Sequence, residues 1–173
     1  MDFEQWLTES TLPELYHNSV IGFPETKKRQ HATNTIKIAH LNWVPYLGMK
    51  TLFVKGLAQN EGREYNPIII FKGVQYREQT GKNIIPLIIN SGQKYLLDQL
   101  SFEKNEVLVR CDCPDHAWRF RHFNSVDRSL YGRDRKKYEA KYRPGSANPE
   151  ELPGLCKHLM VLGKVLKESG IIK

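Results

Sequence analysis

All three cysteines of this 173-residue chain lie in two short segments, and each segment could supply ligands to a metal ion. The sequence RCDC contains Cys111 and Cys113, whereas LCKH contains Cys156 and His158, and 42 residues separate the two inner cysteines. Three thiolates and one imidazole form a complete tetrahedral ligand set of the kind that holds structural zinc. We therefore expect these four residues to bind one structural Zn²⁺, although another thiophilic metal would also suit the set.

The secondary structure expected around the two segments can bring all four side chains to one ion. Cys111 and Cys113 stand two residues apart at the end of a predicted strand, so their side chains point to the same face. Residues two apart in a regular helix point in nearly opposite directions. Cys156 must therefore lie in the turn before a helix and His158 in its first turn, and the sequence LPG at 152–154 supplies that turn.

Other interpretations of these residues compete with a metal site. A disulfide between Cys111 and Cys113 would close a small strained ring, and the cysteines could instead be buried structural residues beside an unrelated histidine, or one could be catalytic. His116 and His122 could substitute as ligands, although surface or packing roles are favoured for both. Asp115 could accept a hydrogen bond from a ligand or cap the turn that follows it.

The region between residues 34 and 113 predicts short strands joined by turns. Pro86 indicates an edge strand or a bulge, and residues 94–100 fit either a strand or a helical turn. Turn-forming sequences such as NEGREYN and NSGQ separate the apolar runs. Such strands predict an antiparallel sheet or a small barrel. The runs rich in β-branched and aromatic residues occupy 36–41, 51–58, 67–76, 83–89 and 106–113.

The N-terminal region predicts a helical arm. Apolar residues at helical spacing in residues 2–18 indicate two short amphipathic helices, the second capped by Ser10 or Thr11, with Glu14 near its positive end. Residues 19–34 are polar and are expected to form a connector.

The C-terminal third predicts a long loop followed by a helix. Residues 114–155 lack a clear period and are expected to be irregular, a length that is unusual unless something fixes the loop. An apolar stripe from Leu159 to Leu166 then predicts a helix that ends at Gly170.

These elements predict an α+β fold with three parts. Residues 1–33 form an N-terminal arm with short helices, and residues 34–105 form a β-rich domain with a small antiparallel β-sheet or barrel. Residues 106–173 form a zinc-bound strand–loop–helix module with a long basic loop and a C-terminal helix.

The net charge of +7 is concentrated in that loop. Seven bases and only two acids lie between residues 128 and 143, together with aromatic residues that could stack on nucleic-acid bases. Such a stretch attracts phosphate backbones or acidic protein surfaces, but it could also be a solvated loop that favours solubility. The bases that could contact a partner are Arg128, Arg133, Arg135, Lys136, Lys137, Lys141 and Arg143.

Several classes of protein are disfavoured by the sequence. No apolar run is long enough to span a membrane, and the acidic N-terminal sequence does not resemble a secretory signal. We therefore expect a protein that is not secreted and stays in a reducing compartment. No nucleotide-binding loop or paired carboxylates stand out, and four protein ligands leave no open metal position. The sequence thus predicts a protein that is not an enzyme and has no small-molecule substrate.

The pattern C-x-C followed by C-x-H, with a strand leading into RCDCPD and a helix opening at LPGLCKHL, resembles the SWIM-type zinc finger. The resemblance covers about the last third of the chain. The 42 residues between the two halves exceed the usual spacing of this finger, which weakens the resemblance to its nucleic-acid-binding members more than the expectation of zinc.

A second resemblance extends from roughly residue 50 to the end. The β-rich region leading into VLVRCDCPDHAWRFRHFN, then LYGRDRKKYEAKYRP and NPEELPGLCKHL, is similar to a group of small virion-associated proteins of tailed phages. This resemblance implies a virion structural or adaptor protein that is made in the host cytoplasm and docks on other virion proteins. The alternative is a SWIM-type zinc module that binds nucleic acid through residues 128–143.

Overall fold

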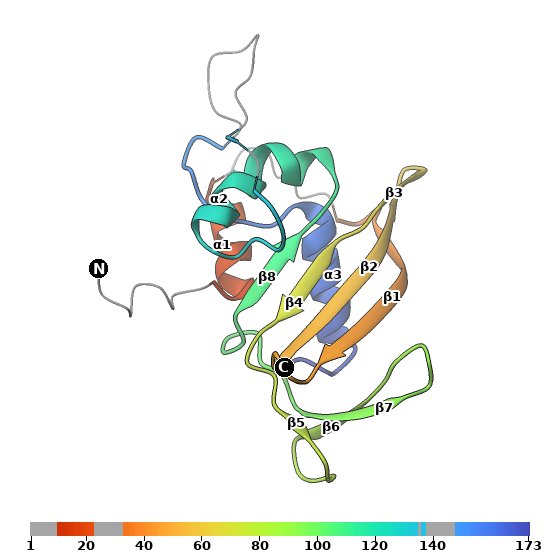
Figure 1. Cartoon of the computed structure of the whole chain (residues 1–173). Coiled ribbons are helices and arrows are strands. Elements are labelled where there is room, and N and C mark those ends of the chain that lie inside the picture. Colours follow the sequence, from red (N-terminus) through yellow and green to blue (C-terminus); the bar gives the residue numbers. More distant parts are fainter. Residues whose placement is uncertain (1–9, 23–32, 135, 138–147) are drawn as a thin grey trace, which may run out of the picture.

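The computed structural model describes residues 10–22, 33–134, 136–137 and 148–173. It confirms the predicted α+β class, with an N-terminal helix, two antiparallel sheets and a C-terminal helix (Figure 1). Both sheets are open, so the barrel considered from the sequence does not form. The first of the two expected N-terminal helices lies outside the described residues, and the predicted division into three parts stays a prediction.

The main sheet contains antiparallel strands in the order β1, β2, β4 and β8, and β3 pairs with the end of β2. Alternation along the strands turns Val54 and Ile69, which are register partners, to the same buried face. The bounds are β1 (Lys37–Tyr46), β2 (Thr51–Asn60), β3 (Arg63–Tyr65), β4 (Ile68–Phe71) and β8 (Val107–Arg110).

A smaller sheet has the strand order β5, β7, β6. It answers two questions that the sequence left open, the structure of residues 94–100 and the place of Pro86. Residues 94–98 form a strand, and Pro86 lies on an edge strand, where a missing N–H group is tolerated. The run 67–76 divides between the two sheets, because Gly73 takes a positive φ of 66° in a turn between β4 and β5. The bounds are β5 (Tyr76–Arg77), β6 (Ile84–Ile88) and β7 (Lys94–Asp98).

Helix α1 (Leu12–Gly22) begins as predicted but extends further. The backbone N–H of Thr11 donates to Glu14 Oε2 at 2.7 Å, which satisfies an unpaired donor at the start of the helix. The prediction of a connector from residue 19 is wrong for residues 19–22, which are helical. Ser19 is buried there and donates its hydroxyl to the Leu15 carbonyl at 2.9 Å, so a polar side chain is accommodated on the inner face.

Residues 116–126 are also helical, which corrects the expectation that all of 114–155 is irregular. A π-helix, η3 (His116–Phe120), continues into α2 (Arg121–Val126). The buried side of this pair includes His116, Arg119, Arg121 and Asn124 beside phenylalanines. Since these buried residues are polar or charged, a search for an apolar helical stripe does not detect the segment.

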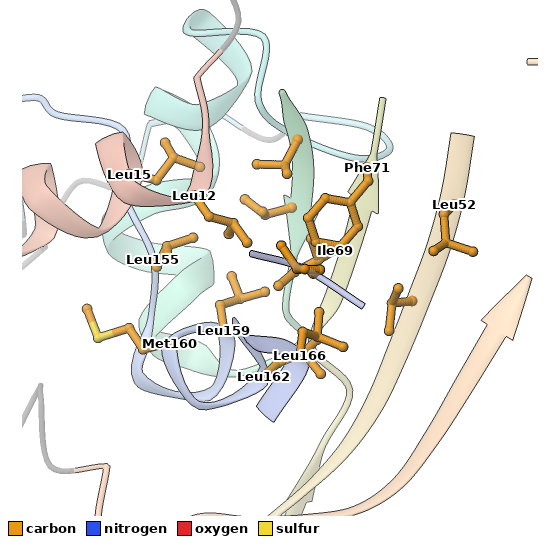
Figure 2. Packing of buried hydrophobic residues seen from close by; sticks show 14 of the residues in the cluster. Leu12, Leu15, Leu52, Ile69, Phe71, Leu155, Leu159, Met160, Leu162 and Leu166 are labelled. Carbon is orange, nitrogen blue, oxygen red and sulfur yellow. The ribbon is translucent and has the colours of Figure 1, made fainter. Parts of the chain in front are cut away.

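Helix α3 (Lys157–Glu168) covers the buried face of the main sheet and completes the core (Figure 1). The predicted stripe is confirmed, because its leucines are fully buried, and Gly170 follows the helix with a positive φ of 78°. Figure 2 shows these side chains pointing toward those of the strands. The facing residues are Leu159, Leu162 and Leu166 from the helix and Leu52, Ile69 and Phe71 from the sheet.

Candidate metal centre

The structure brings Cys111, Cys113, Cys156 and His158 together. One potential ligand atom from each lies within 4.8 Å of those of the other three. Cys111 Sγ and His158 Nδ1 are 4.0 Å apart, somewhat longer than the edge of about 3.6 Å between a sulfur and a nitrogen ligand of tetrahedral zinc. All four residues are buried, with exposures of 0 to 2%. The cluster could therefore hold one metal ion of the size and preference of zinc.

The first two ligands follow directly after β8, which is hydrogen-bonded to β4 in the main sheet. Between them, the exposed Asp112 accepts two hydrogen bonds from Asn66, from the backbone N–H at 2.7 Å and from Nδ2 at 2.8 Å. This pair ties the turn that carries Cys111 and Cys113 to the connection between β3 and β4. The sheet thus fixes the direction of both thiols.

The second pair is placed at the start of α3 in the manner predicted. Cys156 is the N-cap residue, with extended backbone angles of φ −73° and ψ 165°, and His158 is the second residue of the helix. The ring of Tyr65 packs on the His158 ring, with centroids 4.5 Å apart and an interplanar angle of 37°. This packing orients Nδ1 toward the thiols.

The turn before α3 is held by two buried polar side chains that the sequence analysis did not identify. Asn124 accepts from the Gly154 N–H at 2.8 Å and donates Nδ2–H to the Gly154 carbonyl at 3.0 Å. Ser19 accepts from the Leu155 N–H at 2.7 Å. No local signal marks either residue, because each partner lies far away along the chain.

The three thiol groups perturb one another in the way expected for a metal site. Hydrogen bonds from Cys111 and Cys156 lower the pKa of Cys113, which also accepts the His116 backbone N–H at 3.3 Å. The hydrogen bond to Cys113 raises the pKa of Cys111, and burial raises the pKa of Cys156. The three buried sulfurs therefore interact strongly with one another. A divalent cation would satisfy all three sulfurs at once, so the site fits zinc.

The alternative ligands considered from the sequence do not join this cluster in the described part of the chain. His116 is fully buried, and burial lowers its pKa to about 4, so its imidazole is neutral near pH 7. His122 lies near the surface with Nδ1 3.3 Å from Asp134 Oδ2. Asp115 pairs with Arg119 through two hydrogen bonds rather than supporting a ligand.

Four of the seven predicted contact bases are described. Arg128 has a positive φ of 65°, and the carbonyl of Arg133 accepts a hydrogen bond from Arg110 at 3.0 Å. Lys136 is exposed, and Lys137 pairs with Glu151 while its Nζ lies 5.6 Å from the Phe123 ring centroid. The remaining three, Arg135, Lys141 and Arg143, lie outside the described residues.

Within the described residues, no helix has both the length and the apolar character needed to cross a membrane. A scan against protein-family models, a search of curated proteins and a search of solved structures each gave no match.

Proposed function

We propose that this chain is a non-enzymatic protein in which one structural Zn²⁺ is held by Cys111, Cys113, Cys156 and His158. The observation that carries the proposal is the buried set of four convergent donor atoms. When bound, zinc would link the end of β8 to the start of α3 across 42 intervening residues. Zinc would stabilise the fold by fixing the end of β8 to the start of α3.

The closure of the ligand set favours a structural role over a catalytic one. Catalytic zinc sites provide three protein ligands and leave a position for water or substrate, whereas structural sites provide four. Here four donors converge, and none is more than 2% exposed. Water would have neither a free coordination position nor access to the ion.

Metal analysis of a matched pair of variants tests the zinc site. His158→Asn should lose zinc, because the replacement removes an imidazole ligand from the cluster, whereas His122→Asn should keep it. His122 is a suitable control because its ring lies near the surface and outside the cluster. The measurement is the zinc-to-protein ratio by elemental analysis after dialysis. Equal ratios near one in both variants would contradict the assignment.

We further propose that the protein acts as an adaptor in the virion of a tailed phage, docking on other virion subunits. The sequence resemblance over the region from residue 50 to the end supports this role. Exposed apolar side chains at the turn between β1 and β2 are suited to contact with a neighbouring subunit. These are Tyr46, Leu47 and Met49, with exposures of 48, 51 and 74%.

Cross-linking of intact particles followed by mass spectrometry tests the adaptor role. Cross-links from Lys50, which follows the exposed apolar turn, to another virion protein are expected. Cross-links from Lys82, in the turn before β6, serve as a comparison from a different surface. Absence of the chain from purified particles would overturn the proposal.

A second function, binding of nucleic acid, is favoured by the exposed bases Arg133, Lys136 and Lys137. If these residues contact phosphates, affinity for duplex DNA should fall steeply between about 50 and 200 mM salt because bound counterions are released. Lys136→Ala with Lys137→Ala should reduce the salt slope by about two. Lys82→Ala with Lys94→Ala, which removes the same charge elsewhere, is the control. A flat salt response would exclude this function.

A further inference from the structure

A groove of about 730 Å³ lies between α1 and α3 and has an apolar floor. This volume is typical of a binding pocket. Leu12, Leu155 and Met160 lie together where the two helices meet (Figure 2). On the wall contributed by α1, the Tyr16 side chain is 52% exposed although it faces this apolar surface. The groove is therefore accessible and presents apolar surface to a ligand.

The rim of the groove is basic. Lys164 and Lys167 of α3 and Lys173 line it, and Glu103 is the acidic residue among the described residues of the lining. Lys164 is well exposed, and its Nζ lies 4.0 Å from Glu168 Oε1, the upper limit for an ion pair. A ligand that combines apolar side chains with several carboxylates would match both the floor and the rim.

Residues 1–9, with the sequence MDFEQWLTE, combine apolar side chains with several carboxylates. Phe3, Trp6 and Leu7 have the spacing i, i+3, i+4 that places side chains on one face of a helix. The acids are Asp2, Glu4 and Glu9, and the segment contains no Lys or Arg. By contrast, residues 23–32 contain three bases and one acid, so they do not complement the lysine rim.

The attachment point of residues 1–9 is close to the groove. The carbonyl of Ser10 accepts a hydrogen bond from the Val107 N–H at 3.1 Å, and the Ser10 hydroxyl donates one to Asp127 at 2.8 Å. These bonds hold the start of the described chain in place. Leu12 and Pro13, only two and three residues further on, already line the groove. The seven steps from Ser10 back to Phe3 span about 10 Å in a helix and up to about 24 Å in an extended chain, so in either form the segment can reach a groove that already begins at Leu12.

We propose that residues 1–9 of the same chain bind in the groove between α1 and α3. Phe3, Trp6 and Leu7 contact the apolar floor, and the acids face Lys164 and Lys167. A nine-residue helix is marginal alone in water, so the groove supplies the stabilisation that the segment lacks. This inference does not depend on the metal centre or on the proposed function.

The test measures the solvent accessibility of Trp6 in the full-length protein. Replacing the other two tryptophans, Trp43→Phe and Trp118→Phe, leaves Trp6 as the single tryptophan, which is excited at wavelengths that tyrosine does not absorb. Acrylamide quenching of Trp6 should be much weaker than quenching of a synthetic peptide of residues 1–10. Equal quenching in the two samples would overturn the proposal.

Charge reversal tests the role of the rim. Lys164→Glu with Lys167→Glu should weaken docking by roughly two- to fivefold for each ion pair lost, the usual effect of exposed pairs, and quenching should rise. Adding Asp2→Lys with Glu4→Lys should restore protection by exchanging the two charges. Lys82→Glu with Lys94→Glu changes the net charge equally and should leave quenching unchanged.

Two further outcomes would reject the proposal. Loss of Trp6 protection on dilution, with a dimer in size-exclusion chromatography, would show that the segment occupies the groove of a second copy. An equal rise in quenching for both lysine pairs would show a response to net charge without docking in the groove.

Discussion

At the residue scale, Gly154 has the least room of the residues that support the metal centre. A Cβ atom at this position would lie 2.5 Å from Ser19 Oγ and 2.6 Å from Cε1 of Phe120, both shorter than real Cβ contacts. The backbone cannot move away easily, because Asn124 binds both the N–H and the carbonyl of this glycine. The glycine therefore allows α1, η3 and the turn before Cys156 to meet.

Replacing this glycine should damage stability and metal binding together. Gly154→Ala should lower the free energy of unfolding by about 1–3 kcal/mol, the usual cost of inserting a methyl group into packed surroundings. Zinc affinity should fall as well, since Cys156 is two residues away. Urea denaturation and competition with a zinc indicator measure the two effects. Gly48→Ala is the control, because a Cβ there would meet nothing within 4 Å. Equal stability of the two variants would contradict this account.

The identities of the four potential ligands were predictable because cysteine and histidine are rare and their local spacing limits how they can converge. The residues that hold them were not predictable. Ser19 and Leu155 are 136 positions apart, and Asn66 and Asp112 are 46 apart. Nothing in the local composition of either member indicates the other, because these contacts depend on how the whole chain folds.

At the scale of the elements, the strands were easier to predict than the helices that join them. Runs of Ile and Val form strands because branched side chains pack well on a pleated surface. Gly73 divided one predicted run, since its positive φ turns the chain from one sheet into the other. The segment η3–α2 was missed because Arg119 and Asn124 occupy its buried side and interrupt the apolar period.

The two sheets are linked by Tyr76 at the start of β5. Its hydroxyl donates to the Thr51 carbonyl in β2 at 2.6 Å, and burial raises the pKa of Tyr76 to about 12. In the unfolded chain this phenol ionises near pH 10. Between these two values the unfolded state binds fewer protons than the folded state, so the free energy of unfolding falls as pH rises.

Removing this phenol should flatten the alkaline part of the stability profile. Between pH 10 and 12, the free energy of unfolding of the parent should fall by about 1 kcal/mol more than that of Tyr76→Phe. This value is reduced to allow for partial exposure of the ring. Tyr131→Phe, which removes a phenol from a more exposed ring, is the control. Urea denaturation at a series of pH values measures the difference. The same alkaline slope in all three proteins would contradict the role given to Tyr76.

At the scale of the whole molecule, the cluster joins the main sheet to the helix that covers it. Two potential ligands follow the end of β8, the other two lie at the N-cap and in the first turn of α3, and Leu159 and Leu162 belong to the same core. The sheet and helix also share a large apolar interface, so the fold does not rest on the ion alone. Loss of metal should therefore weaken the structure without abolishing every element.

Zinc should stabilise the folded chain by a free energy that grows with the logarithm of the free zinc concentration. At a free zinc concentration about a thousandfold above the dissociation constant, the free energy of unfolding should rise by about 4 kcal/mol. Urea denaturation in zinc-buffered solutions, with a chelator as the metal-free condition, measures this dependence. His158→Asn should show little response to zinc. Identical midpoints for the parent with and without zinc would contradict the linkage between metal and fold.

The position of α3 in the chain has a consequence for synthesis on the ribosome. Leu52 and Ile69 emerge long before Leu159 and Leu162, the helix residues that cover the same side of the sheet. Until Cys156 to Leu166 have been translated, the nascent sheet exposes this apolar face, and the pair of thiols after β8 lacks half of its ligands. Translation of this single segment then supplies both the cover and the missing donors. The nascent chain is thus most vulnerable to aggregation just before α3 is made.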